Sequence, residues 1–407
     1  MTEGALAGIR VIDWTHYHQG AAGAMLLAEL GADVIHVEPP GRGDLMRGLA
    51  SMFGVPLALP GGRHALFEDL NKNKRSICLD LARPAGREIM YRLVEQADVF
   101  VTNMRPQAVH KLGMEYPALA ERAPRLIYGE ASAFGDRGPE RESPGLELMA
   151  YARSGGMLAS GEAGWPPVYL APGIGDRIGG IFLAFGVLAA LVVRERTGIG
   201  QYFSTSQLGG MIHLQSAAVL ATLLTGQNVR ATPRERANNP LFNWYLCRDG
   251  RWIALGILID VQRHWPVFCR AIGRPELIED SRFADTAARA RHGAELVAIL
   301  DDLFAEQPCD EWERRLRAGG DLTFTPMNSL ADLAADPQIR ANGYLIEFNH
   351  PTLGPTPATP LPIAFSATPT ATPTAAPACG QHTEEILIEL LGLTWEEIAS
   401  LREQAVI

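Results

Sequence analysis

A single acid stands among glycines in the stretch APGIGDRIGG, residues 171–180, directly before a strongly apolar run. This acid is Asp176. Its simplest role is to cap the following helix, because an Asp side chain accepts hydrogen bonds from N–H groups of a first helical turn. The glycines also leave space for a bulky substrate, and a helix N-terminus stabilises developing negative charge. A carboxylate in such a place can act as a covalent nucleophile, so both roles stay open.

Basic residues gather at positions that suit a phosphate-bearing ligand. Lys72, Lys74 and Arg75 cluster in NKNKRS just before a predicted strand, and Arg105 follows another strand. Arg42 lies in the Gly-rich turn PPGRGD. Guanidinium forks and ammonium groups are common partners of phosphates. Each residue alone is more typical of a solvated surface charge, but together, at one edge of one sheet, they predict a phosphate pocket.

Two other chemistries fit these residues less well. The segment that ends at Glu38 imitates a dinucleotide-binding unit, but His18 stands where the first glycine of G-x-G-x-x-G is required. Without that glycine the backbone lacks the tight turn that reaches a pyrophosphate. His16 and His18 lie two positions apart, yet no third ligand follows at a spacing typical of metal sites. The sequence therefore predicts no nicotinamide or flavin site and no metal site.

The composition is that of an ordinary globular protein. The 407 residues are 47% hydrophobic and 20% charged, enough for two or three domains. The net charge of −10 argues against a nucleic-acid or membrane surface spread over the whole protein. Five scattered cysteines without a CxxC pair indicate reduced thiols. Residues 181–193 are too few to span a bilayer and no signal run opens the chain, so we expect a cytoplasmic protein.

The first part of the chain alternates strand-like and helix-like segments. We predict strands in GIRVIDW, DVIHVE, RSICLDL, DVFVTN and RLIYGEAS, and helices in AAGAMLLAELGA and PAGREIMYRLVEQA. This alternation predicts a parallel sheet with helical crossovers. Ligands bind beyond the carboxyl ends of such strands, which directs attention to residues 16–19, 38–42, 103–105 and 132–135.

The rest of the chain changes character. NWYLCRDGRWIALGI predicts a β-hairpin around the two-residue turn Asp249-Gly250, and mostly helical segments follow it. Residues 367–378, ATPTATPTAAPA, are Pro-rich and are expected to be extended and exposed. Residues 383–407 carry two amphipathic helical patterns.

Taken in order, these segments resemble the class III coenzyme A transferases, which include formyl-CoA transferase and crotonobetainyl-CoA:carnitine CoA-transferase. The opening unit that resembles theirs is LAGIRVIDWTHYHQGAAGAMLLAELGADVIHVEPPGRGD. Later landmarks are LNKNKRSICLDL, DVFVTNMRPQAVHKLG, ASAFGDRGP, GDRIGGIFLAFGVLAALVVRERTGIGQ, DPQIRANGYLIEFNHPTLG and GQHTEEILIELLGL. Each piece is weak alone, but their order and spacing are highly specific and run nearly end to end.

The resemblance implies that Asp176 is the catalytic nucleophile. The family's aspartate attacks an acyl-CoA thioester and gives a mixed anhydride and CoA thiolate. The thiolate returns to the aspartyl carbonyl and forms an enzyme–CoA thioester, which the carboxylate of the acceptor acid attacks. One thioester replaces another, so the reaction needs no metal, ATP or redox cofactor. Coenzyme A is then a cosubstrate, and no tightly bound cofactor is expected.

The resemblance also implies that CoA binds along the carboxyl edge of the sheet. His18 stands where formyl-CoA transferase has an active-site glutamine, and it is expected to donate a hydrogen bond to an acyl or anhydride oxygen. Pro39 stands where that enzyme has an arginine, for which Arg42 is expected to substitute. The full set of expected CoA-binding residues is His18, Arg42, Asn73, Lys74, Arg75 and Arg105.

Two alternative functions remain open for a chain of this kind. The α-methylacyl-CoA racemases belong to the same family and move a proton between a His and an Asp. Their His corresponds to Leu146, which cannot carry a proton, so racemisation is disfavoured. The other alternative is a non-catalytic acyl-CoA-binding protein, and the presence of Asp176 with its glycines argues against it.

The family fold is α/β and has two domains. A Rossmann-like large domain with a parallel sheet carries an inserted smaller α+β domain, and two subunits form an interlocked homodimer. We expect residues 1–200 to form the N-terminal part of the large CoA-binding domain, 201–225 a linker helix, 226–330 the small domain, 331–350 a second linker and 351–407 the segment that returns to the large domain. Expected partners are acyl-CoA and carboxylic acids, with no nucleic acid and no membrane.

Overall fold

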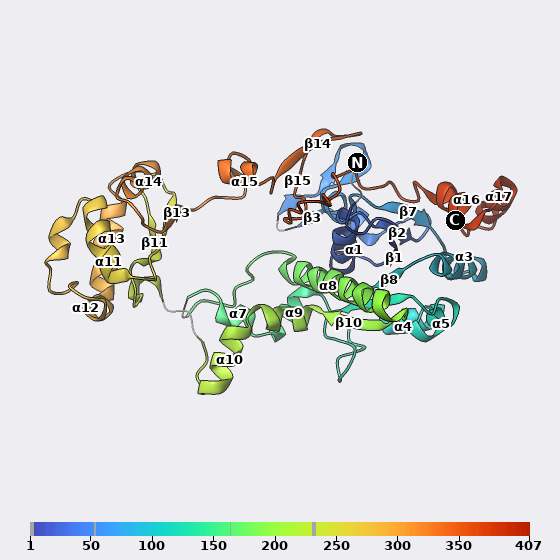
Figure 1. The fold of residues 1–407 in the computed structure, drawn as a ribbon, viewed down its shortest axis with the longest axis horizontal. Coiled ribbons are helices and arrows are strands. Elements are labelled where there is room, and N and C mark those ends of the chain that lie inside the picture. Colours follow the sequence, from blue (N-terminus) through green and yellow to red (C-terminus); the bar gives the residue numbers. More distant parts are fainter. Residues whose placement is uncertain (1–3, 53, 163, 230–232) are drawn as a thin grey trace. The chain divides into compact units, whose positions relative to one another are not determined.

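The structure is a computed structural model that describes residues 4–52, 54–162, 164–229 and 233–407. The chain divides into two compact units, each of which is discontinuous in sequence (Figure 1). The first unit contains Met1–Leu158, Tyr169–Gln227 and Pro337–Ile407, and the second contains Ala159–Val168 and Asn228–Asp336.

The first unit is built on a six-stranded sheet whose strands are all parallel, as the alternating pattern predicted. The strand order is β10-β9-β8-β1-β2-β7. From β1 the chain adds β2 and β7 on one side of the sheet, and it then adds β8, β9 and β10 on the other side. Ligands of open parallel sheets bind where the strand order reverses in this way, which here is between β1 and β8. The strands are β1 (Arg10–Trp14), β2 (Asp33–Glu38), β7 (Arg75–Cys78), β8 (Val99–Thr102), β9 (Ile127–Ser132) and β10 (Tyr202–Ser206).

Helices cover both faces of this sheet, because successive strand residues point to opposite sides. Val11 packs with α1 (Gln19–Glu29) and α8 (Ile174–Thr197). Its neighbour Ile12 packs on the other face with α3 (Pro84–Glu95) and with the C-terminal helices α16 (Thr383–Leu391) and α17 (Trp395–Glu403). Burial on both sides explains why the strands read as nearly continuous apolar runs.

Helix α8 lies close against α1 (Figure 1). A Cβ atom at Gly180 would lie 2.9 Å from the backbone nitrogen of Gly23, and one at Gly23 would lie 2.9 Å from the carbonyl oxygen of Gly180. Larger residues would push the two helices apart. By length and composition alone, α8 is apolar enough to cross a membrane, but the core helices of globular proteins meet the same criterion. One face of α8 is packed on α1 and β9.

The second unit is α+β and has its own core. β11 (Phe242–Leu246), β12 (Trp252–Gly256) and β13 (Phe324–Pro326) form an antiparallel sheet. The predicted hairpin of β11 and β12 is confirmed, but its loop is longer than expected: the N–H of Cys247 donates to the carbonyl of Arg251 (2.8 Å), which leaves residues 248–250 as the turn. Helices α11 (Val261–Ala271), α13 (Gly293–Phe304) and α14 (Cys309–Ala318) complete this unit, together with α12 (Thr286–Arg291).

Two segments expected as linkers are folded instead. The stretch 201–225 is not one helix: it contains β10, α9 (Gln207–Leu214) and α10 (Ser216–Thr225). The Ser206 side chain caps α9, and the two helices meet at 73° around Gln215. In the stretch 331–350, α15 (Pro337–Ala341) is followed by β14 (Ile346–His350), which pairs with β15 (Gly354–Ala358).

The remaining elements are short. The Pro-rich stretch 367–378 contains no helix or strand, as predicted, although Ala376 is buried in a small apolar cluster instead of exposed. The helices not yet named are α2 (Ala65–Asn71), α4 (Pro106–Leu112), α5 (Tyr116–Arg122), α6 (Glu147–Arg153) and α7 (Gly156–Ala159), and the small hairpins are β3 (Ser51–Met52) with β4 (Val55–Pro56) and β5 (Ala58–Leu59) with β6 (Arg63–His64).

Candidate active site

Asp176 is the third residue of α8 and does not cap it. The N-cap is Gly173, at φ 78°, which makes no side-chain cap bond. The capping role belongs to Glu147 at the start of α6, whose carboxylate accepts from the backbone N–H groups of Gly173 (2.9 Å) and Gly175 (2.7 Å). The capping interpretation of Asp176 is therefore wrong, and its carboxylate is left for other contacts.

The glycines before Asp176 make room for the protein's own side chains. A Cβ atom at Gly173 would lie 2.4 Å from Cε1 of His18, and one at Gly175 would lie 2.8 Å from Cγ of Glu147. Gly173 also needs its positive φ, which other residues rarely adopt. These glycines therefore bring an imidazole and a second carboxylate up to the start of α8.

The Asp176 carboxylate has a different neighbour at each oxygen. The amide Nε2 of Gln207, the first residue of α9, donates to Oδ1 at 2.5 Å. The Nδ1 atom of His18 lies 3.5 Å from Oδ2. The Asp176 side chain is 17% exposed, so it is mostly buried yet reachable. The residue before α1 and the first residue of α9 thus converge on one carboxylate of α8.

The electrostatic setting disfavours the ionised form of Asp176. Burial, reinforced by the negative charge of Glu147, raises its pKa to about 7, while the Gln207 hydrogen bond opposes this rise. Burial and then the nearby Arg177 lower the pKa of His18 to about 4, so this imidazole is neutral near pH 7. Arg177 itself forms an ion pair with Asp69. The carboxylate is consequently poorly neutralised, which keeps it reactive when it ionises.

Several buried polar atoms near Asp176 have no partner among the described residues. They include Nε2 of His18, Oε1 of Gln207 and Nε2 of Gln19. Gln19 lies beside α8, because a Cβ at Gly179 would come within 2.5 Å of its Nε2. Buried polar groups normally find hydrogen bonds, so these atoms suit the oxygens of a ligand.

Sequence reasoning missed four residues of this site. Glu147 and Gln207 start helices far from Asp176 in sequence, and Tyr169, whose hydroxyl donates to Glu147 (2.5 Å), precedes the glycines. No local pattern identifies them. Gln19 was within reach, because it lies at the end of the segment 16–19 that follows the first strand.

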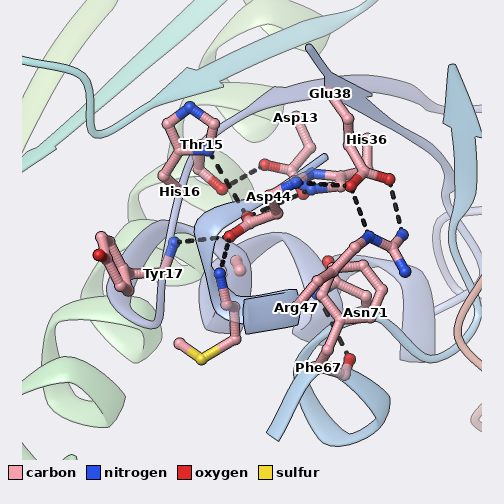
Figure 2. Close-up of polar contacts among 12 residues, drawn as sticks. Asp13, Thr15, His16, Tyr17, His36, Glu38, Asp44, Arg47, Phe67 and Asn71 are labelled. Carbon is pink, nitrogen blue, oxygen red and sulfur yellow. Dashed lines mark hydrogen bonds and ion pairs between the residues drawn. The ribbon is translucent and has the colours of Figure 1, made fainter. Parts of the chain in front are cut away.

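The loop that carries His18 is held from several sides (Figure 2). Tyr17 adopts φ 58°, an uncommon conformation for a residue with a side chain. Its backbone N–H faces Oδ1 of Asp44 at 3.5 Å, and Asp44 also accepts from the N–H of Met46 (2.7 Å). The Asn103 side chain, just after β8, both accepts from the N–H of His16 (2.8 Å) and donates to its carbonyl (2.7 Å).

A buried charge network lies beneath this loop. His36 lies between Asp13 (3.1 Å) and Asp44 (3.5 Å) (Figure 2). Burial alone would lower the pKa of His36, but the Asp13 carboxylate raises it to about 10. Burial alone would likewise raise the pKa of Asp13, but Lys74 and His36 hold it well below its usual range. The network is therefore a set of buried groups in which each acid lies next to a cationic partner.

Lys74 belongs to that network and not to a phosphate pocket. Its ammonium is fully buried and donates to Asp13 (2.8 Å), to the carbonyl of Ala21 (3.0 Å) and to Asn71 (2.9 Å). All three hydrogens are used, so the expected phosphate contact has no donor left. The expectation fails because a long side chain next to a strand can turn inward to a buried acid.

The other expected CoA-binding residues do not share one edge of the sheet. Asn73 and Arg75 precede or start β7 and therefore lie at its amino end, where Arg75 pairs with Asp33 (2.6 Å). Arg42 and Arg105 follow β2 and β8 at the carboxyl edge, and both are exposed. The single basic cluster predicted from sequence is thus split, because residues before and after parallel strands fall on opposite edges.

Arg42 lines a cavity of about 170 Å³ at the carboxyl edge. The wall comes from the ends of four strands and the segments after them, and includes Trp14, Glu38, Asp80 and Met104. No group of three or more metal-ligating side chains occurs within the described parts of the chain. The edge therefore offers a cavity that His16 helps to line, next to the loop that carries His18.

Comparison with known proteins fits this geometry. The sequence model of CoA-transferase family III matches residues 6–383. The (R)-2-hydroxy-4-methylpentanoate CoA-transferase of Clostridioides difficile is 32% identical over 405 residues and 99% of each chain is covered. The succinyl-CoA–D-citramalate CoA-transferase of Chloroflexus aurantiacus is 33% identical over 414 residues, covering 99% of this chain and 98% of the other.

The fold is shared with a solved structure as well. A crystal structure of a CAIB/BAIF family protein from Brucella suis superposes with a TM-score of 0.86 at 28% identity, covering 96% of this chain and 100% of that one. Match to the family spans nearly the whole length, so it includes both compact units and the segment around Asp176. The chain belongs to CoA-transferase family III and is a CoA-transferase, as the resemblance implied.

Proposed function

We propose that this enzyme moves coenzyme A from an acyl-CoA to a carboxylic acid through covalent intermediates on Asp176. The observation that carries the proposal is the setting of the Asp176 carboxylate. It is mostly buried, hydrogen-bonded to Gln207 on one oxygen and faced by a neutral His18 on the other. Burial and Glu147 together raise its pKa to about 7, so a large fraction is ionised near neutral pH while little of its charge is quenched.

The first half of the reaction loads CoA onto the enzyme. An oxygen of Asp176 attacks the thioester carbonyl, the C–S bond breaks, and the products are a mixed anhydride and CoA thiolate. The thiolate then attacks the aspartyl carbonyl and displaces the original acid as a carboxylate. The unpaired amide of Gln19 is well placed to donate to the oxyanion in these steps, since buried donors stabilise such charge strongly.

The second half reverses these steps with a new acid. The acceptor carboxylate attacks the aspartyl–CoA thioester, which gives a new anhydride and CoA thiolate. The thiolate attacks the acyl carbon of that anhydride, so that the new acyl-CoA leaves and Asp176 is regenerated as a carboxylate. The overall reaction exchanges one thioester for another, so neither ATP nor a tightly bound cofactor is required.

The CoA nucleotide is proposed to lie along the carboxyl edge of the sheet. Arg42 lines the cavity there, and Arg105 is exposed at the N-terminus of α4 on the same edge. Both guanidinium groups suit phosphates. Asn73, Lys74 and Arg75 are not included, because two lie at the opposite edge and Lys74 is fully paired.

We propose a 2-hydroxy acid as the acceptor class. The C. difficile relative is named for (R)-2-hydroxy-4-methylpentanoate and the C. aurantiacus relative for D-citramalate, and both acids carry a hydroxyl next to the carboxylate. In this chain His18 and Gln19 offer unpaired polar atoms beside Asp176, which suit such a hydroxyl.

We further propose a homodimer in the cytoplasm, of the interlocked kind that the family resemblance implies. The support is apolar surface that α8 and α10 leave exposed. Phe185 on α8 and Leu223 and Leu224 on α10 are each more than half exposed. An interlocked dimer would cover large apolar side chains of this kind, which are otherwise left in contact with water. Light scattering on the purified chain tests this point, and a monomer would contradict it.

The covalent route is tested with succinyl-CoA as donor and a panel of 2-hydroxy acids as acceptors. Hydroxylamine added during turnover is expected to trap a hydroxamate on the peptide that contains Asp176, detected by mass spectrometry. Asp176→Asn should give no adduct, whereas Asp69→Asn, which removes a neighbouring acid, should still give one. Turnover without any adduct on Asp176 would overturn the covalent route, and solvent deuterium entering the α-carbon without an acceptor would favour racemisation instead.

A further inference from the structure

Two cysteines that are far apart in sequence meet at the end of β7. The Sγ atoms of Cys78 and Cys379 lie 3.4 Å apart, although the two residues are 301 positions apart along the chain. Both are free thiols, Cys78 half-buried and Cys379 exposed. From this separation, a small movement of the two side chains brings the sulfur atoms to the length of a disulfide bond.

The backbones on both sides of this contact are fixed by hydrogen bonds. The N–H of Cys78 donates to the Thr383 hydroxyl (3.1 Å), and the N–H of Gly380 donates to the Ser76 hydroxyl (2.9 Å). The N–H of His382 donates to the carbonyl of Ser76 (3.0 Å). The segment around Cys379 is therefore held against β7 independently of the thiols, and this holds the two sulfurs together.

We propose that Cys78 and Cys379 form a reversible disulfide, a modification site that fastens the C-terminal segment to the carboxyl end of β7. The exposed Cys379 reacts first with a peroxide: its thiolate attacks one peroxide oxygen, the O–O bond breaks, and a sulfenic acid forms with release of hydroxide. The Cys78 thiol then attacks the sulfenic sulfur, the S–S bond forms, and water leaves. The two sulfurs lose two electrons in total, and the peroxide gains them.

The electrostatics of the pair support this order of events. The hydrogen bond from the Cys78 thiol lowers the pKa of Cys379, and the same contact, together with burial, raises the pKa of Cys78. Cys379 is thus the thiol that ionises first, and the thiolate is the form that reacts. Cys78 remains protonated until it resolves the sulfenic acid.

The second unit supplies an internal control. Cys247 and Cys309 also lie close enough for their thiols to interact, but both are buried in the core of that unit. Cys269 is buried there as well. Burial raises the pKa of all three thiols. A mild oxidant should therefore reach one pair of cysteines and leave the other three unchanged.

The test is oxidation of the full-length native protein by a small excess of hydrogen peroxide. The expected result is a mass lower by two hydrogen atoms, a cross-linked peptide that joins Cys78 to Cys379, and reversal by dithiothreitol. The oxidised protein should also unfold at a higher temperature than the reduced protein, because the cross-link restricts the unfolded chain. Cys247, Cys269 and Cys309 should still react with iodoacetamide after denaturation.

Two variants separate the steps. In Cys78→Ser the sulfenic acid at Cys379 has no resolving thiol, so it should be trapped by dimedone; in Cys379→Ser neither the cross-link nor the dimedone adduct should form. Oxidation of the wild-type protein tests the cross-link without any substitution. The proposal therefore remains testable even if one of the two variants fails to fold. Oxidation of Cys379 to a sulfinic acid beside an unmodified Cys78, or a cross-link between two chains, would overturn the proposal.

Discussion

Asp13 is fully buried and Asp176 is mostly buried, each next to a histidine, and the two carboxylates have opposite electrostatic settings. Asp13 has two cationic partners, Lys74 at 2.8 Å and His36 at 3.1 Å, and also accepts from the hydroxyl of Thr15 (2.6 Å). Asp176 has an amide, a neutral imidazole and a second carboxylate near by. The pKa of Asp13 is held below its usual range, whereas that of Asp176 rises to about 7.

The difference separates paired structural acids from the proposed nucleophile within one domain. The Asp13 network fixes the loop that carries His18, and it does so with charges that are fully paired and out of contact with solvent. The Asp176 carboxylate lacks such pairing and remains 17% exposed. Distance from compensating charge, more than burial itself, therefore distinguishes the candidate nucleophile from its buried neighbours.

The largest expected effect comes from Asp176→Asn, which should change activity and stability in opposite directions. Transfer should fall by at least about 10³-fold, since the nucleophile is lost. Stability should rise, because the Asp176 pKa moves from its ordinary 3.8 to about 7, roughly three pKa units, so that ionisation in the native state costs up to about 4 kcal/mol.

The pH dependence of that gain checks its origin. Since the folded-state pKa is raised, the wild-type protein carries the full cost above pH 7 and loses it as the pH falls toward 4. Denaturation midpoints of wild type and Asp176→Asn should therefore differ most near pH 8 and converge near pH 4. A gain that is independent of pH would contradict the raised pKa.

Next in size is Lys74→Met, which should lower stability and leave the affinity for CoA unchanged. Removing the ammonium leaves the Asp13 carboxylate buried with one cation fewer, and breaking such a pair typically costs about 3–5 kcal/mol. The double variant Asp13→Asn/Lys74→Met should recover part of that loss in chemical denaturation. Arg42→Met, an exposed control, should change the unfolding free energy by less than about 0.5 kcal/mol. If well-folded Lys74→Met lost affinity for CoA, Lys74 would have to be counted among the CoA-binding residues after all.

A smaller effect is expected from Gln207→Leu. The Gln207 amide stabilises the ionised Asp176 carboxylate, so its loss should raise the pKa of Asp176 further. A hydrogen bond to a charged group contributes about 1.5 kcal/mol or more, which corresponds to about one pKa unit. The acidic limb of kcat/KM against pH, expected near 7 in the wild type, should move up by about that amount. Gln215→Leu, whose amide bonds to Ser154 instead, should leave the limb in place.

Glu147→Gln should shift the same limb downward by less than about one pH unit. The negative charge of Glu147 helps to raise the pKa of Asp176, and a neutral amide removes it. The N–H groups of Gly173 and Gly175 donate to different oxygens of Glu147, so the single oxygen of Gln can keep only one of these bonds, and the start of α8 should be weakened as well. An upward shift would mean that Glu147 acts on Asp176 through geometry and not through charge.

Much of the fold was predictable from local patterns. Apolar strands alternating with helices specified the parallel sheet, and the glycines around Asp176 pointed to the start of α8. The site was only partly predictable, because Glu147 and Gln207 reach Asp176 from helices that no local signal connects to it. Basic residues were the least well predicted. The sequence does not show that Lys74 turns inward to a buried acid, and the position of Arg75 before a strand, which places it at the amino edge, was given too little weight.

Substitution of Arg75 tests whether this residue lies away from the CoA site, and we expect it to have the smallest effect on stability and activity. Arg75 pairs with Asp33 and with Glu389 on α16, and Asp33 keeps a second partner in Arg10 at 2.8 Å. Arg75→Ala should therefore cost about 1 kcal/mol or less and leave the KM for acyl-CoA within about twofold. Arg105→Ala, at the carboxyl edge, should instead raise that KM about tenfold with little change in kcat, because it removes binding shared by ground state and transition state. Equal KM effects from the two variants would place the CoA nucleotide elsewhere than along the carboxyl edge.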